Sequence, residues 1–207
     1  FNFTRTAFED RVWNDLTIRA RGLYINIPKQ KVVARAYDKF FRVNERPETK
    51  MDILQYKLQF PATAYVKENG FLGLVSYNEE TDDLFITTKS SPDGECAMWL
   101  KNLLTATLSS AQLDRLRVLT KELDSTFVFE CVDMVHDPHI IEYPESKLFL
   151  LDIVKNDMKF QKQPYEKIVQ CAAELGLAPK EKALVIESWQ DFFDWYYEVM
   201  DEDYLYN

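Results

Sequence analysis

The chain has 207 residues, 46% of them hydrophobic and 14% aromatic, a composition that supports one well-filled globular domain. Its three cysteines are odd in number, far apart and form no C-x-x-C pair, so neither a disulfide framework nor a zinc site is suggested, and reduced, buried thiols are predicted. No apolar run approaches the roughly 20 residues that span a bilayer, and residues 1–15 lack a signal-peptide core. A cytoplasmic protein without a membrane partner is therefore expected.

The net charge of −9 argues weakly against a nucleic-acid partner, but the charge is unevenly distributed. Residues 1–60 carry 12 Lys and Arg against 7 Asp and Glu, whereas residues 61–207 carry 13 against 27. A local positive field can bind phosphates whatever the total charge. The pattern thus permits a phosphate site in the first part of the chain.

In chain order, residues 4–18 have apolar side chains at helical spacing, which predicts a short amphipathic helix. Residues 23–27 and 31–35 flank a polar turn at Pro28 and predict a hairpin. A compact aromatic and polar connection follows them.

A second hairpin is predicted around Lys67-Glu68-Asn69-Gly70, which separates the apolar segments 62–66 and 71–75. Asn-Gly is the strongest short hairpin signal, because both residues tolerate the positive φ angles of a type I′ turn. A further strand over residues 82–88 ends at Lys89.

The remaining chain contains longer helices and strands. Ser109-Ser110 is interpreted as the break and N-cap between two helices, Gly176 closes a third, and the aromatic stripe of the last helix is expected to lie in the core. The predicted helices cover residues 97–108, 111–123, 165–174 and 189–200, and the predicted strands cover residues 126–132 and 147–154.

Along the chain, the predicted strands occur in hairpins and the predicted helices occur in separate groups. This order indicates an α+β fold with a mainly antiparallel sheet. With five glycines, the chain contains neither G-x-G-x-x-G nor G-x-x-x-x-G-K-[ST], so a Rossmann site and a P-loop are both unsupported.

Lys67 has two interpretations, a solvated lysine beside a surface turn or a nucleophile. An unperturbed lysine amine is protonated at neutral pH, so a nucleophilic lysine needs neighbouring cations, a metal or desolvation to favour its neutral form. Basic residues at or near the ends of predicted strands could be aimed at one cleft: Arg21, Arg35, Lys39 and Lys89.

The order and spacing of these segments resemble the adenylyltransferase domain of ATP-dependent RNA ligases. The resemblance is to the phage-type ligase that reseals cleaved tRNA and to the ligase domain of fungal tRNA-splicing enzymes, and it covers residues 18–155. K-x-[DN]-G alone is a weak signal, so the ordered set carries the resemblance. The set comprises Arg21-Gly22-Leu23-Tyr24-Ile25, Arg35 to Phe41 with Asn44-Glu45, Lys67-Glu68-Asn69-Gly70, Lys89, Phe129-Glu130-Cys131-Val132 and Lys147 to Ile153.

The resemblance implies a nucleotidyltransferase fold, with mainly antiparallel sheets flanked by helices, and a role for each matching residue. Lys67 would form the covalent lysyl-AMP, and Gly70 would let the loop turn close to the nucleotide. Glu130 would lie near the ribose and, through water, the metal, and Phe149 would belong to the strand beside the adenine. The implied ATP and phosphate-binding residues are Arg21, Lys39, Glu68, Gly70 and Lys89.

The implied cofactors are ATP and Mg²⁺ or Mn²⁺, and the implied partner is RNA, either tRNA or broken RNA ends, with further end-healing or RNA-specificity domains. Members of the family continue to an E-G-[FYV]-V strand and a K-x-K strand that activate the lysine. Residues 181–186 have a glutamate and an apolar run but lack the glycine, and are interpreted as a helical or connecting segment. Residues 1–207 are therefore expected to form an adenylyltransferase domain that is incomplete at its C-terminal end.

Three alternatives stay open: a DNA ligase, a capping-type nucleotidyltransferase, and a nucleotide- or RNA-binding module without catalysis. A metal cluster of His136 and His139 with Asp133 and Glu142 is set aside, because the Asp137-Pro138 turn favours a plain hairpin. The acidic segment 191–203 is interpreted as a solvated helix face.

Overall fold

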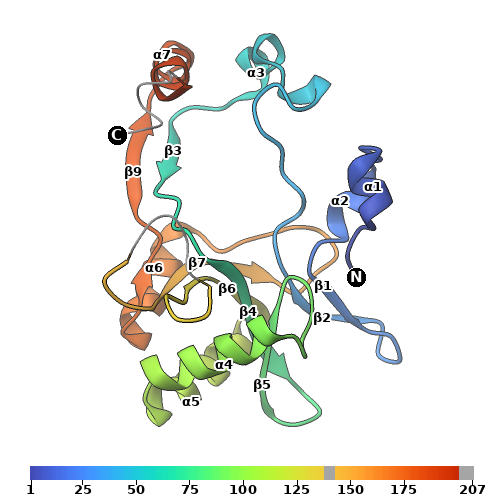
Figure 1. Ribbon diagram of the computed structural model, residues 1–207, viewed down its shortest axis with the longest axis vertical. Coiled ribbons are helices and arrows are strands. Elements are labelled where there is room, and N and C mark those ends of the chain that lie inside the picture. Colours follow the sequence, from blue (N-terminus) through green and yellow to red (C-terminus); the bar gives the residue numbers. More distant parts are fainter. Residues whose placement is uncertain (138–142, 201–207) are drawn as a thin grey trace. The chain divides into compact units, whose positions relative to one another are not determined.

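The computed structural model describes residues 1–137 and 143–200 (Figure 1). Contacts divide the chain into two compact units. Unit 1 consists of Phe1–Phe40 and Glu68–Lys180, and unit 2 consists of Phe41–Lys67 and Glu181–Asn207, described up to Met200. That the whole chain acts as one adenylyltransferase domain stays a prediction.

A five-stranded sheet forms the centre of unit 1, in the order β5-β4-β6-β7-β8. Strand β8 runs parallel to β7, and the other neighbours are antiparallel. The strands predicted in this part of the chain are confirmed to within one or two residues at most of their ends. They are β4 (Phe71–Asn78), which extends three residues beyond its predicted end, β5 (Asp83–Thr88), β6 (Ser125–Val132) and β7 (Lys147–Lys155). The short strand β8 (Ala178–Pro179) was not predicted.

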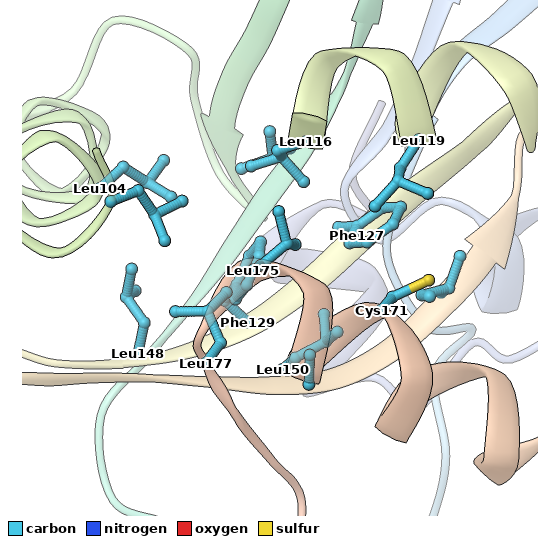
Figure 2. Close-up of a cluster of buried hydrophobic side chains, with 14 of the residues drawn as sticks. Leu104, Leu116, Leu119, Phe127, Phe129, Leu148, Leu150, Cys171, Leu175 and Leu177 are labelled. Atoms are coloured by element: carbon cyan, nitrogen blue, oxygen red, sulfur yellow. The ribbon is translucent and has the colours of Figure 1, made fainter. Parts of the chain in front are cut away.

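Three helices cover one face of this sheet and enclose the main core (Figure 2). They are α4 (Glu95–Thr107), α5 (Ser110–Glu122) and α6 (Tyr165–Leu175). Figure 2 shows Leu116 and Leu119 of α5 close to Phe127 of β6, and all three side chains are buried. As predicted, Ser109 caps α5 and Gly176 closes α6 with a φ of 66°.

The cysteines are unbridged thiols, as expected. Cys131 and Cys171 are buried, and Cys96 is half-buried. Because Cys131 lies on β6 and Cys171 on α6, both pack within the main core.

The opposite face of the sheet carries a hairpin of β1 (Leu23–Asn26) and β2 (Lys31–Arg35), as predicted. The backbone N–H of Arg35 donates to Oγ1 of Thr126 at 3.0 Å, and Oγ of Ser76 donates to the Val33 carbonyl at 2.7 Å. A second, smaller apolar cluster lies on this side: Ala36, Leu74, Val128 and Val154, with Tyr24, Tyr37, Leu72 and Phe160 packed against it.

The single helix predicted over residues 4–18 is wrong, because two short helices replace it. These are α1 (Arg5–Glu9) and α2 (Asp15–Arg19). The chain reverses between them at Arg11, which has a φ of 53°. Asn14 then starts α2 by accepting backbone hydrogen bonds from Leu16 and Thr17, a capping box with Thr17.

Unit 2 contains a two-stranded antiparallel sheet of β3 and β9. The pairing continues beyond β3, where the Val66 N–H donates to the Glu181 carbonyl at 2.9 Å. The elements of the unit are η1 (Pro47–Thr49), α3 (Met51–Lys57), β3 (Ala62–Tyr65), β9 (Lys182–Ile186) and α7 (Trp189–Met200).

This sheet contradicts two predictions. Residues 182–186 form a strand and not a helical or connecting segment, because β3 gives their backbone a hydrogen-bonding partner. Nor are β3 and β4 paired as a hairpin across Lys67, because β4 is hydrogen-bonded to β5 at one edge and to β6 at the other. Neither Asn69 nor Gly70 has a positive φ, so the type I′ turn is absent.

The aromatic stripe of α7 is also not the core that was predicted. Trp189, Phe192 and Tyr196 are half-buried, and Phe193 is exposed. Among the described residues of unit 2, Ile186 alone is buried. A helix can therefore carry an apolar stripe here without having a deep core to enter.

Candidate active site

Leu72, Glu130 and Phe149 form one row across three strands of the sheet in unit 1. Glu130 is directly opposite Leu72 on β4 and directly opposite Phe149 on β7. Side chains of directly opposed residues share a face, and successive residues on a strand alternate between faces. Phe129 and Cys131 accordingly enter the helix-covered core, while Glu130 is half-buried on the other face.

Gly70, which ends the Lys67-Glu68-Asn69-Gly70 tetrapeptide, contacts this row. Its backbone N–H donates to Oε1 of Glu130 at 3.0 Å. A Cβ atom on Gly70 would lie 2.2 Å from the carbonyl oxygen of Cys131, closer than any real contact. The glycine is therefore required for close approach of two backbones and not for a turn.

Tyr143 holds the middle of the same tetrapeptide. Its hydroxyl donates to Oε2 of Glu68 at 2.8 Å and accepts from the backbone N–H of Asn69 at 2.9 Å. Burial raises the pKa of Tyr143, and the Glu68 carboxylate also favours the protonated phenol. Glu68, Asn69 and Gly70 thus all have polar contacts, and Tyr143 was not found by sequence reasoning because nothing local marks it.

Arg21 and Lys89 come together through Gly22. With a φ of 62°, Gly22 packs so closely that a Cβ atom there would lie 3.0 Å from Cα of Lys89. The Arg21 guanidinium donates to the Tyr37 carbonyl at 3.3 Å and lies 5.5 Å from the centre of the Phe40 ring. Two predicted phosphate-binding cations are therefore neighbours in unit 1.

The electrostatics of this pair favour an anion. Burial lowers the pKa of Lys89, and the positive charge of Arg21 lowers it further. Burial also lowers the pKa of Arg21, partly opposed by Tyr37. Two partly desolvated like charges repel each other, so a phosphate group placed beside them would relieve that repulsion.

The two other candidate cations differ in their surroundings. Lys39 is half-buried; its ammonium donates to the Phe40 carbonyl at 2.7 Å and lies 5.6 Å from the Trp13 ring. Arg35 is 1% exposed, pairs with Asp38 and donates to the Asp157 carbonyl at 2.6 Å. Because its donors are directed at protein acceptors, Arg35 is a structural residue.

Lys67 is exposed, and it is the last residue of its segment of unit 2, joined to Glu68 at the start of the next segment of unit 1. Its neighbour Val66 is held by the hydrogen bond to Glu181. The backbone is therefore fixed by hydrogen bonds on both sides of Lys67, by Glu181 before it and by Tyr143 after it.

The His136 cluster, which the sequence analysis set aside as a metal site, is described in part. Nδ1 of His136 lies 2.9 Å from Oδ2 of Asp133, and the His136 ring stacks on Trp99 at 5.3 Å. Pro138, His139 and Glu142 lie outside the described residues. Within residues 1–137 and 143–200, no group of three acidic, histidine or cysteine side chains is placed to hold a metal ion.

The acidic segment 191–203 is described only up to Met200, and its acidic residues up to that point are exposed, as expected for a solvated helix face. None of the helices described is long and apolar enough to cross a membrane.

Comparison with solved structures defines the class of fold. The chain matches an archaeal ATP-dependent RNA ligase with a TM-score of 0.57 and 13% sequence identity, over 86% of this chain and 46% of that chain. The α+β architecture predicted from the sequence, an ATP-dependent ligase nucleotidyltransferase fold, is thereby confirmed.

Sequence comparison gives the family. The RNA ligase family model matches residues 19–206, and the chain belongs to this family. It is also 28% identical over 187 residues to a tRNA ligase of Candida albicans. That alignment covers 78% of this chain but 22% of the tRNA ligase, so the chain spans about a fifth of that relative.

Proposed function

We propose that this chain is the adenylyltransferase part of an ATP-dependent RNA ligase and that Lys67 is its covalent nucleophile. The observation that carries the proposal is the contact between Gly70 and Glu130 at 3.0 Å. It joins the K-E-N-G segment to a carboxylate on the face of the sheet opposite the three helices. The match of an RNA ligase family model over residues 19–206 supports the same function.

In the proposed first step the neutral amine of Lys67 attacks the α-phosphate of ATP. A P–N bond forms, the bond between the α-phosphorus and the bridging oxygen breaks, pyrophosphate leaves, and the attacking nitrogen releases one proton to water. Negative charge on the phosphates is neutralised by cations, which is the role proposed for Arg21, Lys89 and Lys39. Glu130 is placed beside the loop to accept a hydrogen bond from a ribose hydroxyl or a metal-bound water.

In the second step a 5′-phosphate oxygen of RNA attacks the phosphorus of lysyl-AMP, which restores the lysine and gives an RNA capped by AMP through a pyrophosphate link. In the third step an RNA 3′-hydroxyl attacks the 5′-phosphate, and AMP leaves. The tRNA ligase relative makes tRNA the substrate that we propose, with any end-healing domains outside this segment.

The carboxylates of the site suit a metal that is bound mainly by the nucleotide. Glu130 and Glu68 are both half-buried, and both accept hydrogen bonds. Mg²⁺ keeps several waters and commonly binds through one or two carboxylates and substrate phosphates. We propose that Glu130 holds Mg²⁺ or Mn²⁺ through water, and the metal would neutralise charge on the phosphates.

The test is covalent labelling of the full protein with ATP carrying a radioactive α-phosphate, in the presence of Mg²⁺. The expected result is a covalent label that survives denaturation and alkali and is released by acid, as a P–N bond requires. Lys67→Ala should abolish this label and Lys57→Ala should leave it intact. Lys57 is the matched control, since it is also an exposed lysine in unit 2. A wild-type protein that binds ATP without forming the adduct would overturn the proposal in favour of a non-catalytic binding module.

Substrate comparison separates the remaining alternatives. A labelled protein should join tRNA halves that carry a 5′-phosphate and a 3′-hydroxyl. Preferential sealing of nicked DNA would indicate a DNA ligase instead, and labelling by GTP but not ATP would indicate a capping-type enzyme.

A further inference from the structure

Asp152 is a buried carboxylate that the proposed chemistry does not use. Its side chain lies on β7 with the residue 3% exposed. The Tyr37 hydroxyl donates to Oδ2 at 2.6 Å, and the Lys180 ammonium donates to the same oxygen at 2.8 Å. Burying a charge is unfavourable unless partners compensate it, so the desolvation of this cluster opposes folding.

The second carboxylate oxygen is less well satisfied. The ammonium of Lys162 lies 3.5 Å from Oδ1, an ion-pair distance, and Oδ1 accepts no hydrogen bond from the described residues. Hydrophobic residues would fill such a position at no electrostatic cost. The polar cluster therefore requires a reason other than packing.

The cluster is on the face of the sheet that carries Glu130. Asp152 is directly opposite Val128, which belongs to the small apolar cluster on that face, two residues from Glu130 on β6. Tyr37 packs against this same cluster. Burial raises the pKa of Tyr37 strongly, and the charges of Asp152 and Glu130 raise it further, which places the phenol within the field of both carboxylates.

Tyr37 connects the buried cluster to the proposed phosphate cations. Its hydroxyl holds Asp152, while its backbone carbonyl accepts from the Arg21 guanidinium at 3.3 Å. Lys39, the third proposed cation, is two residues further along the chain. A shift of Tyr37 would therefore move the acceptor of Arg21 and the segment that carries Lys39.

We propose that Asp152 is a positioning residue for adenylyl transfer, which fixes Tyr37 and through it orients Arg21 toward the nucleotide phosphates. This inference rests on the proposed function. A misplacement of about 1 Å at a charge-stabilising group can cost up to about 100-fold in rate. Lys180 is the counter-cation that makes the buried carboxylate tolerable.

The main test uses Tyr37→Phe, which removes the hydroxyl and keeps the ring in its apolar cluster. At saturating ATP, the rate of lysyl-AMP formation should fall about 10- to 100-fold. Because the variant acts through Arg21, it should cause little further loss in an Arg21→Gln background, as a double-mutant cycle would show. Asp152→Asn should behave in the same way.

Tyr77→Phe is the matched control, since Tyr77 also donates to a carboxylate, Asp82, at 2.6 Å, near the far end of β4. It should leave the rate unchanged. A folded Tyr37→Phe protein that is adenylylated at the wild-type rate overturns the inference alone, and so does full additivity with Arg21→Gln. A wild-type protein that forms no adduct overturns the proposed function as well.

Discussion

The backbone N–H of Gly70 and the carboxylate of Glu130 are joined by a hydrogen bond of 3.0 Å across 60 residues of sequence. The contact links the segment that follows Lys67 to the central strand of the sheet in unit 1. It depends on Gly70 lacking a side chain, because the Cys131 carbonyl occupies the space of its Cβ atom. A substitution at Gly70 should therefore disturb both the packing of the loop and the position of the proposed nucleophile, Lys67.

Gly70→Ala should destabilise the protein and abolish adenylylation together. The new methyl group would lie 2.2 Å from the carbonyl oxygen of Cys131. It must move away to an ordinary contact distance, and this movement displaces the loop. Overpacking of this kind costs about 1–3 kcal/mol of unfolding free energy. Urea unfolding and covalent labelling measure both effects. Gly94→Ser is the control, since a Cβ atom there meets the Ser91 Cβ atom at an ordinary 3.7 Å and serine is a good N-cap.

Glu130→Gln should separate folding from catalysis. The amide oxygen can still accept the Gly70 hydrogen bond, so the unfolding free energy should change by less than about 1 kcal/mol. The lost negative charge should lower the rate of lysyl-AMP formation, because a neutral amide is a poorer acceptor for a metal-bound water. An unchanged rate at saturating ATP and Mg²⁺ would show that the Glu130 charge has no part in the reaction.

Lys89 should lose its proton at a lower pH than an ordinary lysine. Burial and the neighbouring Arg21 charge both lower its pKa, so the ammonium form is depleted as the pH rises through this lowered value. Arg21→Gln removes the second cause and should move the titration to higher pH. NMR titration of the methylated ε-amine measures the shift, with Lys89→Arg to assign the signal. Movement to lower pH in Arg21→Gln would contradict the coupling.

Asp133 should stabilise the folded protein near neutral pH, and this stabilisation should be lost in acid. Burial opposes ionisation of its carboxyl, but hydrogen bonds from His136 and from the Val135 N–H outweigh this, so the net pKa is lowered. The unfolded chain therefore takes up the proton first as the pH falls. The stabilisation is present above the ordinary carboxyl pKa and is lost as the pH falls through the lowered one.

Urea unfolding of the wild type and Asp133→Asn, from about pH 6 down to about pH 2, measures this contribution. The stability advantage of the wild type should shrink toward the acid end of that range. An advantage that stays constant with pH would show that Asp133 has no linked titration.

Ser109→Ala should destabilise the protein by about 1 kcal/mol, because it removes the capping box of α5. For a chain of this size the melting temperature should fall by about 2–4 °C. Thr105→Ala is the control on α4, since its hydroxyl only bonds back to the Lys101 and Asn102 carbonyls of its own helix, and it should change stability by less than about 0.5 kcal/mol. Equal losses in both variants would argue against a specific cap.

Sequence patterns predicted the elements whose signals are local. The hairpin of β1 and β2, the cap at Ser109 and the closing Gly176 each depend on residues within a few positions. The break before Asn14 was also locally marked, since Asn14 and Thr17 have capping-box spacing, but the longer helical periodicity masked it.

The errors arose where distant backbone decides the structure. The Asn-Gly pair has a strong turn signal, yet β3 pairs with β9, more than 100 residues away. Strand β4 has β5 at one edge and β6 at the other, so it has no edge left for a hairpin with β3. Arg21 and Lys89 were predicted as one site from a family resemblance, and the structure places them as neighbours. Tyr143 and Asp152 have no sequence pattern of their own, because their partners are long-range.

Strand β6 places Phe127, Phe129 and Cys131 on the helix-covered face and Glu130 on the other face by simple alternation, and this restricts which mutations the strand tolerates. At Phe127 and Phe129 the protein should tolerate only side chains of similar volume. At Glu130 it should tolerate only side chains that keep the negative charge. A single-codon deletion within β6 would exchange the two faces and turn the carboxylate into the core. Insertions and deletions should therefore be absent from this strand in any library selected for function. The kinds of point substitution that are tolerated should alternate from one residue to the next along the strand.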